Sequence, residues 1–473
     1  HGVDFANKAD RQYTQSVSNI FDRGSIFFKT KDGVAISAAT LKNGFTIAIN
    51  PKMIKNQDEV YIALASVMDI NKGDFYAKAG KKDDPYEEIV KHIEESVAEK
   101  LQALKITGLV ITKDKWRYYP GEKTASNVLG FVGYKGDRLL GRYGLEQYYE
   151  DVLKRSGESL YTNFFAQIFS NIKKTFEIDG SVEGDITTTI EPTVQNMLEG
   201  ALNKVESKWD SDYSGGLIIN PQTGEIYAMA MSPSFDPNNF QSVSNLFTFS
   251  NPVVDSGFEM GSIIKALTMA MGLDVEKVTP ESTFNDTGTV TLDGYTIGNH
   301  GMSAQGKTTM QEVLNKSLNT GATYVEQRVG HDVFLKYVND FGLGEKTGID
   351  LPGEVAGRIA NLNTLRGVEY ANASFGQGIA LSPIATARAL SALGNGGYLI
   401  TPHIVQTINY DVGIGGKNIS YGKGKQVIKK ETSDTITKML VNVVDKALLN
   451  GTVKNEHYSI AAKTGTAQIS RPK

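Results

Sequence analysis

The sequence predicts an α+β protein of more than one domain, on the strength of three observations. The chain has 473 residues, which is too many for one ordinary hydrophobic core. Its composition, 40% hydrophobic and 22% charged, is that of a globular protein. Both helical and strand-like patterns occur along the chain, and the pattern changes near residue 186. We therefore expect one domain over residues 1–186 and another over residues 187–473.

Composition also narrows the function. A formal net charge of -4 gives no electrostatic reason to expect a nucleic acid as partner. The chain has no cysteine, and its six histidines show no metal-binding spacing, so we expect no metal site. No apolar run reaches the roughly 18 residues of a membrane-spanning helix. The start at His1, without a methionine, suggests that an upstream segment was removed.

The first domain is expected to carry amphipathic surface helices. Apolar residues recur at helical spacing in segment 57–70 and again in segment 84–104, where Pro85 is a helix-start signal. The stretch between them, "NKGDFYAKAGKKDD", is expected to be a polar connector.

The second domain opens with alternating structure. The text "ITTTI" at residues 186–190 reads as a strand, a helix is expected near 192–206, and "SGGLIINPQTGEIYAMAMS" reads as two strands joined by a turn at "NPQTGE".

One helix of this domain carries an unexpected lysine. From Ser262 onward the segment "FEMGSIIKALTMAMGLD" is apolar on every face, so the helix should be buried. Burial lowers the pKa of Lys265 toward the neutral amine, which is a base. Ser262 lies three residues earlier on the same face, at the helix N-terminus, where a developing negative charge is favoured. The pair suits an activated nucleophile; the alternative is that Ser262 caps the helix and Lys265 extends to solvent.

The spacing Ser-x-x-Lys alone does not decide between these alternatives, because it occurs four times. The other pairs are Ser170 with Lys173, Ser420 with Lys423, and Ser470 with Lys473. They lie in a doubly basic segment, in a glycine-rich segment and around a proline, respectively. Only Ser262 opens an apolar helix.

Two further stretches can serve the same chemistry. Thr309 and Glu312 are spaced as a capping box before a short helix, and the following "SLN" can present the Ser317 hydroxyl and the Asn319 amide to one cleft, although such residues also make turns. In "SIAAKTGTAQIS", residues 459–470, an apolar strand is expected to lead into Lys463, Thr464, Gly465 and Thr466. A second "KTG" at Lys346 stands in a turn-rich loop, and we discount it.

In this order the three elements are the signature of penicillin-recognising serine acyltransferases. The chain resembles a class B penicillin-binding protein, a monofunctional peptidoglycan D,D-transpeptidase, over essentially its whole length. The resemblance rests on further segments: "FDRGSIFFKTKDGVAISA", "RYYPGEKTASNVLGFVG", "GRYGLEQYYEDVL", "NPQTGEIYAMAMSPSFDPNNF", "FGLGEKTGIDLPGEVAG" and "ASFGQGIALSPIATARALSALGNGG". The sequence departs from the family's usual motifs in places, with "FEMGSIIK" instead of "YEPGSTFK" and "SLN" instead of "SSN". These differences remove no reactive group.

The resemblance implies a fold. Residues 1–186 would form an elongated pedestal, or dimerisation-like, domain, and residues 187–473 a transpeptidase domain with an antiparallel sheet covered by helices on both faces. In the family two more strands and a C-terminal helix follow the Lys-Thr-Gly strand, so we expect this domain to be truncated at its C-terminus. "SLNTG" favours a division-type member over an elongation-type member.

The resemblance also implies roles for the site residues. Ser262 would attack the penultimate D-alanine of a stem peptide, with Lys265 as base, and Ser317 would relay the proton to the leaving nitrogen. Asn319 would hold the substrate amide, Lys463 would add positive charge, and Thr464 and Thr466 beside Gly465 would receive the terminal carboxylate. The N–H groups of Ser262 and Thr466 would form the oxyanion hole, and no cofactor is needed.

Partners and location follow from the family in the same way. Stem peptides and β-lactam antibiotics would be the ligands, and a membrane glycosyltransferase with other cell-wall proteins would be the partners. An N-terminal anchor, absent from this chain, would hold the domains on the outer side of the cytoplasmic membrane. Three alternatives stay open: a β-lactam sensor or β-lactamase-like hydrolase, a bifunctional class A protein, which would need a glycosyltransferase domain that the first 186 residues do not resemble, and a catalytically silent cell-wall scaffold.

Overall fold

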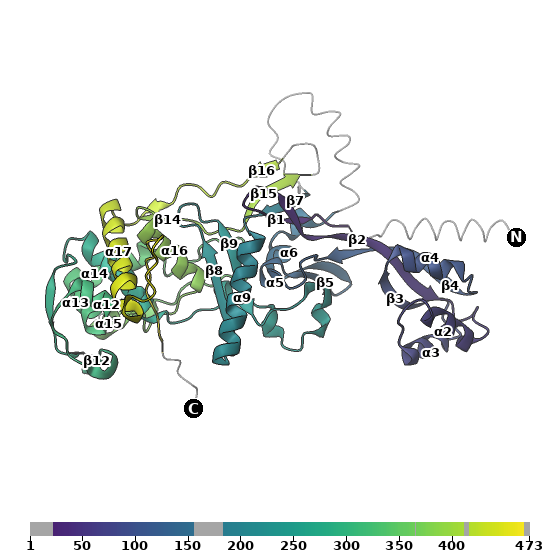
Figure 1. Ribbon diagram of the computed structural model, residues 1–473, viewed down its shortest axis with the longest axis horizontal. Coiled ribbons are helices and arrows are strands. Elements are labelled where there is room, and N and C mark those ends of the chain that lie inside the picture. Colours follow the sequence, from purple (N-terminus) through teal and green to yellow (C-terminus); the bar gives the residue numbers. More distant parts are fainter. Residues whose placement is uncertain (1–21, 156–182, 365, 411–415, 468–473) are drawn as a thin grey trace, which may run out of the picture.

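The computed structural model describes residues 22–155, 183–364, 366–410 and 416–467. These residues form an elongated molecule, with a small lobe at one end and a larger helical body at the other (Figure 1). No helix in these ranges is both long and apolar enough to cross a membrane.

A seven-stranded mixed sheet connects the two ends of the molecule. Its strand order is β16-β15-β7-β1-β2-β3, and β4 also pairs with β2. The strands are β1 (Ile26–Lys29), β2 (Ala35–Ile49), β3 (Glu87–Ile93), β4 (Leu109–Tyr118), β7 (Gly184–Thr188), β15 (Val405–Tyr410) and β16 (Gly416–Asn418). β7 pairs in parallel with β1 and antiparallel with β15, so segments from both halves of the sequence share this sheet. The domain boundary that we expect at residue 186 falls inside β7 and stays a prediction.

The small lobe, which we name the distal lobe, consists of the second half of β2, with β3 and β4 on either side of it, and three helices. These are α2 (Gln57–Ala65), α3 (Lys72–Ala79) and α4 (Glu95–Ala103). α2 confirms the helix expected in segment 57–70. The single helix expected over 84–104 is wrong in its first half, because Glu87–Ile93 is strand β3, paired with β2.

Packing within this lobe explains why two expectations fail, the helix in the first half of 84–104 and the irregular polar connector before it. Ile93 lies opposite Phe45 and Val90 opposite Ile47, so strand pairing at the sheet edge overrides the helical spacing of the apolar residues. The expected polar connector contains helix α3, which Asn71 caps and which buries Phe75 and Ala79. Two buried side chains one turn apart suffice to fix a short helix whose other positions are polar.

Between the lobe and the helical body lie short elements that pack on the shared sheet. They are α5 (Ser126–Leu129), β5 (Phe131–Lys135), β6 (Arg138–Arg142), α6 (Gly144–Tyr148) and α7 (Glu150–Leu153). Glu146 of α6 is fully buried and accepts hydrogen bonds from Arg23, near the start of β1, and from Arg117 and Tyr119, at the end of β4.

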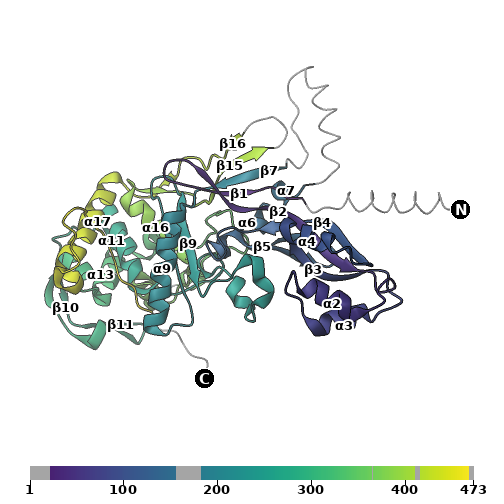
Figure 2. The same cartoon turned by 45° about the vertical axis from the view of Figure 1, so that its right-hand side comes forward.

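The helical body begins with the predicted helix and strand pair. Helix α9 (Pro192–Trp209) runs along the hairpin of β8 (Ser214–Ile219) and β9 (Ile226–Ser232) in both ribbon views (Figures 1 and 2). α10 (Pro252–Asp255) and α16 (Pro383–Gly394) also contact β8. In the described ranges β8 and β9 pair only with each other.

The main core of the body surrounds one helix, α11 (Ile264–Asp274), which packs against α12 to α17. The surrounding helices are α12 (Met310–Asn315), α13 (Asn319–Val329), α14 (His331–Asp340), α15 (Gly367–Ser374), α16 and α17 (Lys430–Asn442). Small two-stranded sheets complete the body: β10 (Thr283–Asp286) with β13 (Gly306–Thr309), β11 (Thr289–Leu292) with β12 (Tyr295–Gly298), and β14 (Tyr398–Leu399) with β17 (Lys425–Gln426).

Short helical turns connect these elements. They are η1 (Pro237–Ser242), η2 (Leu246–Phe249), η3 (Gly261–Ile263), η4 (His300–Met302), η5 (Ala360–Asn363), η6 (Val443–Ala447) and η7 (Leu448–Gly451).

The strand expected at residues 459–470 is not observed in its described part. Residues 459–467 form neither a helix nor a strand, and Ala462 N donates to Leu440 O over 3.4 Å. A strand needs a neighbour that satisfies its backbone groups, and no strand lies beside this segment in the described part of the chain.

Candidate active site

Lys265 is buried in the helical core, as the apolar helix predicts. Its side chain belongs to α11, where ten of eleven residues are buried, and only 1% of it is exposed. The alternative in which Lys265 extends to solvent is therefore wrong. Ser262 does not cap the helix either, because it lies inside the turn η3 and no side-chain cap hydrogen bond is formed at η3 or α11.

Two lysines from distant segments converge on Ser317. Lys265 Nζ lies 2.5 Å from the carbonyl oxygen of Ser317 and 3.2 Å from its Oγ. Lys463 Nζ lies 2.8 Å from the same Oγ and 3.0 Å from the carbonyl oxygen of Thr464. The three motifs found in the sequence are thus joined in one place. Because the Ser317 oxygen accepts from both lysines, its own proton is available for donation to a further group.

The surroundings lower the pKa of both lysines. Burial is the main cause for Lys265, and the charge of Lys463 adds to it, so that its pKa falls to about 7. Burial lowers the pKa of Lys463 to about 8. A large fraction of Lys265 is consequently a neutral amine near neutral pH, which is the form that can accept a proton.

The Ser262 hydroxyl is half-buried and makes no hydrogen bond within the described ranges. The spacing allows a hydrogen bond between Ser262 and Lys265, but in the structure the Lys265 amine binds Ser317 instead. Ser262 is the second residue of η3, and the first N–H groups of a helix have no partner inside it.

The Lys-Thr-Gly segment lies directly against the turn that carries Ser262. A Cβ atom added to Gly261 would stand 2.3 Å from the carbonyl oxygen of Thr466, and one added to Gly465 would stand 2.7 Å from that of Met260. Glycine is therefore required at both contacts, and Gly261 also has φ +58°. Thr464, Gly465 and Thr466 are exposed, so a substrate can reach them beside Ser262.

The Ser-x-Asn segment joins α12 to α13. Thr309 caps α12 by accepting from Glu312 N over 3.2 Å, which confirms the predicted helix start. Ser317 adopts a left-handed backbone with φ +55°, which is uncommon for a residue with a side chain. Asn319 begins α13, and its Nδ2 donates to the carbonyl oxygen of Gly298 over 2.8 Å.

The remaining candidates lie elsewhere. Ser420 and Lys423 are in an irregular segment between β16 and β17, and the pairs at Ser170 and Ser470 lie outside the described residues. In the second Lys-Thr-Gly, Thr347 and Gly348 donate to the carboxylate of Glu354, so this segment forms a closed turn.

The sequence analysis assigns no role to the loop after α15, which packs against the turn that carries Ser262. Gly261 N donates to the carbonyl oxygen of Gly376 over 3.1 Å, and a Cβ atom on Gly376 would lie 2.2 Å from the carbonyl oxygen of Gly261. Gly378 N donates to Glu259 over 3.1 Å. The signal in the sequence is the paired glycines of "FGQG", in one of the segments that carry the family resemblance.

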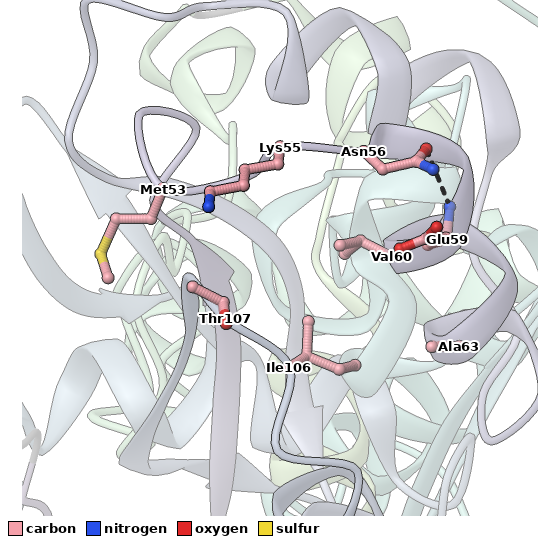
Figure 3. Close-up of a pocket in the computed structure, with 8 residues that line it drawn as sticks. All are labelled: Met53, Lys55, Asn56, Glu59, Val60, Ala63, Ile106 and Thr107. Atoms are coloured by element: carbon pink, nitrogen blue, oxygen red, sulfur yellow. Dashed lines mark hydrogen bonds between the residues drawn. The ribbon is translucent and has the colours of Figure 1, made fainter.

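A separate hollow lies on the distal lobe, between α2 and the segment before β4 (Figure 3). Met53, Lys55 and Ile106 are among the residues that line it, and Asn56 caps α2 there. It contains none of the predicted site residues. In the described ranges no group of three or more His, Asp or Glu side chains could hold a metal ion.

Comparison with known families agrees with this geometry. The family model described as "Penicillin binding protein transpeptidase domain" matches residues 215–473, more than half of the chain, and the "Penicillin-binding Protein dimerisation domain" matches residues 22–181. The chain belongs to the class B penicillin-binding proteins.

Curated relatives of this family match along most of the chain. Stage V sporulation protein D of Bacillus subtilis is 34% identical, and the match covers 94% of this chain and 69% of the relative. Peptidoglycan D,D-transpeptidase FtsI of Buchnera aphidicola is 26% identical over 89% of this chain and 73% of its own length. Penicillin-binding protein 2X of Streptococcus thermophilus shares the fold, with a TM-score of 0.76, 19% identity, and coverage of 96% of this chain and 71% of that chain.

These matches confirm the α+β fold, with an N-terminal dimerisation domain and a C-terminal transpeptidase domain. The activity of this class B penicillin-binding protein is peptidoglycan D,D-transpeptidation.

Proposed function

We propose that the transpeptidase reaction proceeds through an acyl-enzyme on Ser262, with Lys265 as base and Ser317 and Lys463 as its partners. The observation that carries this proposal is the convergence of Lys265 and Lys463 on the Ser317 hydroxyl, within 3.2 Å and 2.8 Å. These residues lie far apart in the sequence, and packing alone does not require two amines, one buried and one half-buried, on one hydroxyl. The half-buried Ser262 stands one helical turn from Lys265.

In the first step the Ser262 oxygen attacks the carbonyl carbon of the penultimate D-alanine of a donor stem peptide. The neutral amine of Lys265 takes the hydroxyl proton. The N–H groups of Ser262 and Thr466 stabilise the oxyanion of the tetrahedral intermediate, an interaction worth on the order of 10²-fold to 10³-fold in rate.

The C–N bond then breaks. The leaving nitrogen takes the proton of the Ser317 hydroxyl, and Lys265, now an ammonium within 3.2 Å, returns a proton to Ser317. Terminal D-alanine leaves with a free amine, and the donor peptide remains as an ester on Ser262. An amine of an acceptor stem peptide attacks the ester carbonyl carbon and loses a proton to Lys265. The ester C–O bond then breaks, and Lys265 returns the proton to the Ser262 oxygen.

The other residues of the site would bind the donor peptide. Asn319 would hold its backbone amide, and the exposed hydroxyls of Thr464 and Thr466 would receive the terminal carboxylate, near the charge of Lys463. A β-lactam would acylate Ser262 in the same way. Its leaving nitrogen stays attached through the opened ring, so the acceptor amine is kept out.

The cellular setting belongs to the proposal as well. Relatives named for sporulation and for peptidoglycan D,D-transpeptidation support a role in cell-wall synthesis. The segment "SLNTG" favours a division-type role over an elongation-type role. We expect the domains to act on the outer side of the cytoplasmic membrane, with a membrane glycosyltransferase and other cell-wall proteins as partners.

Fluorescent penicillin labelling with mapping of the modified peptide tests the nucleophile. Ser262→Ala should abolish labelling, and Lys265→Ala should slow it on the order of 10⁴-fold or more. Ser420→Ala, which alters a Ser-x-x-Lys pair outside the core, is the matched control and should label normally. Ser170→Ala and Ser470→Ala should do so too. Persistent labelling of the Ser262→Ala protein would refute the assignment.

The same adduct separates a transferase from a hydrolase. A hydrolase needs a base to activate water, and Glu259, the acidic residue just before Ser262, is exposed and bound to Gly378 N. We therefore expect the intact-mass spectrum to keep the penicillin adduct for many minutes to hours. Rapid return of the unmodified mass with release of hydrolysed drug would favour the hydrolase.

A further inference from the structure

A buried carboxylate lies behind the Ser-x-Asn segment. Asp286, at the end of β10, is 2% exposed. Its oxygens accept hydrogen bonds from four groups: Gly288 N at 3.0 Å, Gln305 N at 3.0 Å, the Asn299 amide at 2.9 and 3.1 Å, and Thr320 Oγ1 at 2.7 Å. No lysine or arginine pairs with it in the described part of the chain. A buried carboxylate held only by neutral donors is costly, so a purely packing role would be better served by an apolar residue.

The carboxylate fixes the start of helix α13. Thr320, the second residue of α13, donates its hydroxyl to Asp286 and its backbone N–H to Asn299 Oδ1 over 3.2 Å. Leu318 stands at the cap position and makes no side-chain cap hydrogen bond, so Asn299 supplies the missing cap from another segment. The negative charge of Asp286 near this helix end is also favourable for the helix dipole.

The same cluster fixes the group that orients Asn319. The Asn319 amide donates one N–H to the carbonyl oxygen of Gly298, the residue before Asn299. An asparagine amide has two N–H donors, so this bond fixes the amide plane and leaves the other donor for a ligand. Asp286 is therefore linked to Asn319 in two ways. Its bond with Thr320 fixes the start of the helix that contains Asn319, and its bonds with Asn299 fix the segment whose Gly298 carbonyl accepts from the Asn319 amide.

We propose that Asp286, together with Asn299, is a positioning residue that sets the Asn319 amide for recognition of the donor's amide group during acylation. This inference rests on the proposed roles of Ser262 and Asn319. It identifies residues 286–305, a segment outside the three motifs, as part of the machinery that selects acyl donors bearing an amide.

Two penicillins that share the bicyclic nucleus and differ in the acyl group on its 6-amino nitrogen test the proposal. Benzylpenicillin carries an acylamino side chain, whereas 6-aminopenicillanic acid has a free amine there. Asp286→Asn keeps the shape but turns one acceptor oxygen into a donor facing other donors. We expect this variant to lower the second-order acylation rate of benzylpenicillin on the order of 10-fold to 100-fold, as a small misplacement of a binding group does. Acylation by 6-aminopenicillanic acid should fall by no more than about 3-fold, because it does not use this contact.

A general loss of structure would lower both rates equally, and that result would overturn the proposal. Asn319→Ala should show the same loss of preference, and the double variant should lose little more than either single variant, since both act on one contact. Asp274→Asn is the matched control. Asp274 is also a buried carboxylate held by neutral donors, from Tyr337, Lys429 N and Thr432, but it lies at the far end of α11. Its variant should keep the wild-type ratio of the two rates.

If Asp286→Asn does not fold, Thr320→Val decides the matter, because it removes one donor to Asp286 at nearly constant volume. A wild-type ratio in Thr320→Val would then overturn the proposal. The wild-type chain separates this inference from the proposed function. If the wild type is not acylated at Ser262, the proposed function fails; if it is acylated and the variants keep its ratio, only the role of Asp286 fails.

Discussion

Lys265 and Lys463 bind one hydroxyl but need opposite charge states for the proposed reaction. Lys265 must be neutral to take the Ser262 proton, which requires a pH above its pKa of about 7. Lys463 must stay charged to attract a carboxylate, which requires a pH below its pKa of about 8. We therefore expect the acylation rate to rise with pH through about 7 and to fall again through about 8.

The measurement is the second-order rate of acylation by a chromogenic β-lactam between about pH 5 and pH 10. Lys463→Arg keeps a positive charge that does not titrate in this range, so the falling limb should disappear while the rising limb remains. A rate that increases only above about pH 10, where an ordinary lysine titrates, would show that Lys265 is not the base.

Single residues also show what the sequence could predict about the site. The burial of Lys265 follows from the apolar residues around it, which are neighbours in the sequence. The role inferred for Asp286 had no such signal, because its partners Asn299 and Thr320 are brought to it by folding from 13 and 34 residues away. A buried carboxylate with neutral donors looks like any surface aspartate in the sequence.

At the scale of elements, the turn before α11 and the loop after α15 have to approach closely. Gly376 has φ +81°, and a Cβ atom there would stand 2.2 Å from the carbonyl oxygen of Gly261. Gly376→Ala should push this turn, and Ser262 with it, out of place. We expect β-lactam acylation to slow on the order of 10²-fold, the usual effect of a shift of about 1 Å in a reacting group.

Gly396→Ala is the matched control for backbone strain. Gly396 has a similar φ of +86°, but an added Cβ would meet nothing closer than 3.9 Å. This variant pays the cost of a left-handed alanine, about 1 to 2 kcal/mol, away from Ser262. Its acylation rate should match that of the wild type; equal loss in both variants would mean that strain, and not the contact with Gly261, is responsible.

Elements were predictable where local pattern and tertiary packing agree. The helices at residues 57 and 192, the hairpin around "NPQTGE" and the capped helix after Thr309 all form as expected. Segment 87–93 has helical spacing, yet its position beside β2 makes it a strand. The segment around Lys463 has a strand-like composition, but it pairs with no strand among the described residues. Strand formation depends on a partner that lies elsewhere in the chain, which local pattern does not reveal.

At the scale of the whole molecule, the shared sheet makes the pedestal and the transpeptidase domain mechanically continuous. β7 is paired on one side with β1 and on the other with β15. Tyr149 adds a side-chain link, because its hydroxyl donates to Asp350, which also accepts from Ile404 N and Val405 N. A substitution that destabilises the sheet near β1 should therefore also destabilise the helical body, which contains the candidate active site.

Glu146 offers the sharpest test of this continuity. Burial alone would raise the pKa of its carboxyl, but the guanidinium groups of Arg117 and Arg23 hold that pKa below its usual value, so the group is charged. Glu146→Gln would leave the buried Arg117 guanidinium without its counter-charge and Arg23 with Glu150 as its remaining partner. We expect the free energy of unfolding to fall by about 3 to 5 kcal/mol. Glu94→Gln, which breaks only the exposed pair with Lys42, should change it by no more than about 1 kcal/mol.

The decisive observation is which part of the molecule unfolds. Because β1, β7 and β15 form one sheet, Glu146→Gln should lower, by the same amount, the temperature at which circular dichroism reports unfolding and the temperature at which penicillin labelling of Ser262 is lost. Both readouts should follow one transition. If labelling survives to the wild-type temperature while part of the dichroism signal melts early, then the two domains unfold independently, and the shared strands do not couple the pedestal to the active site.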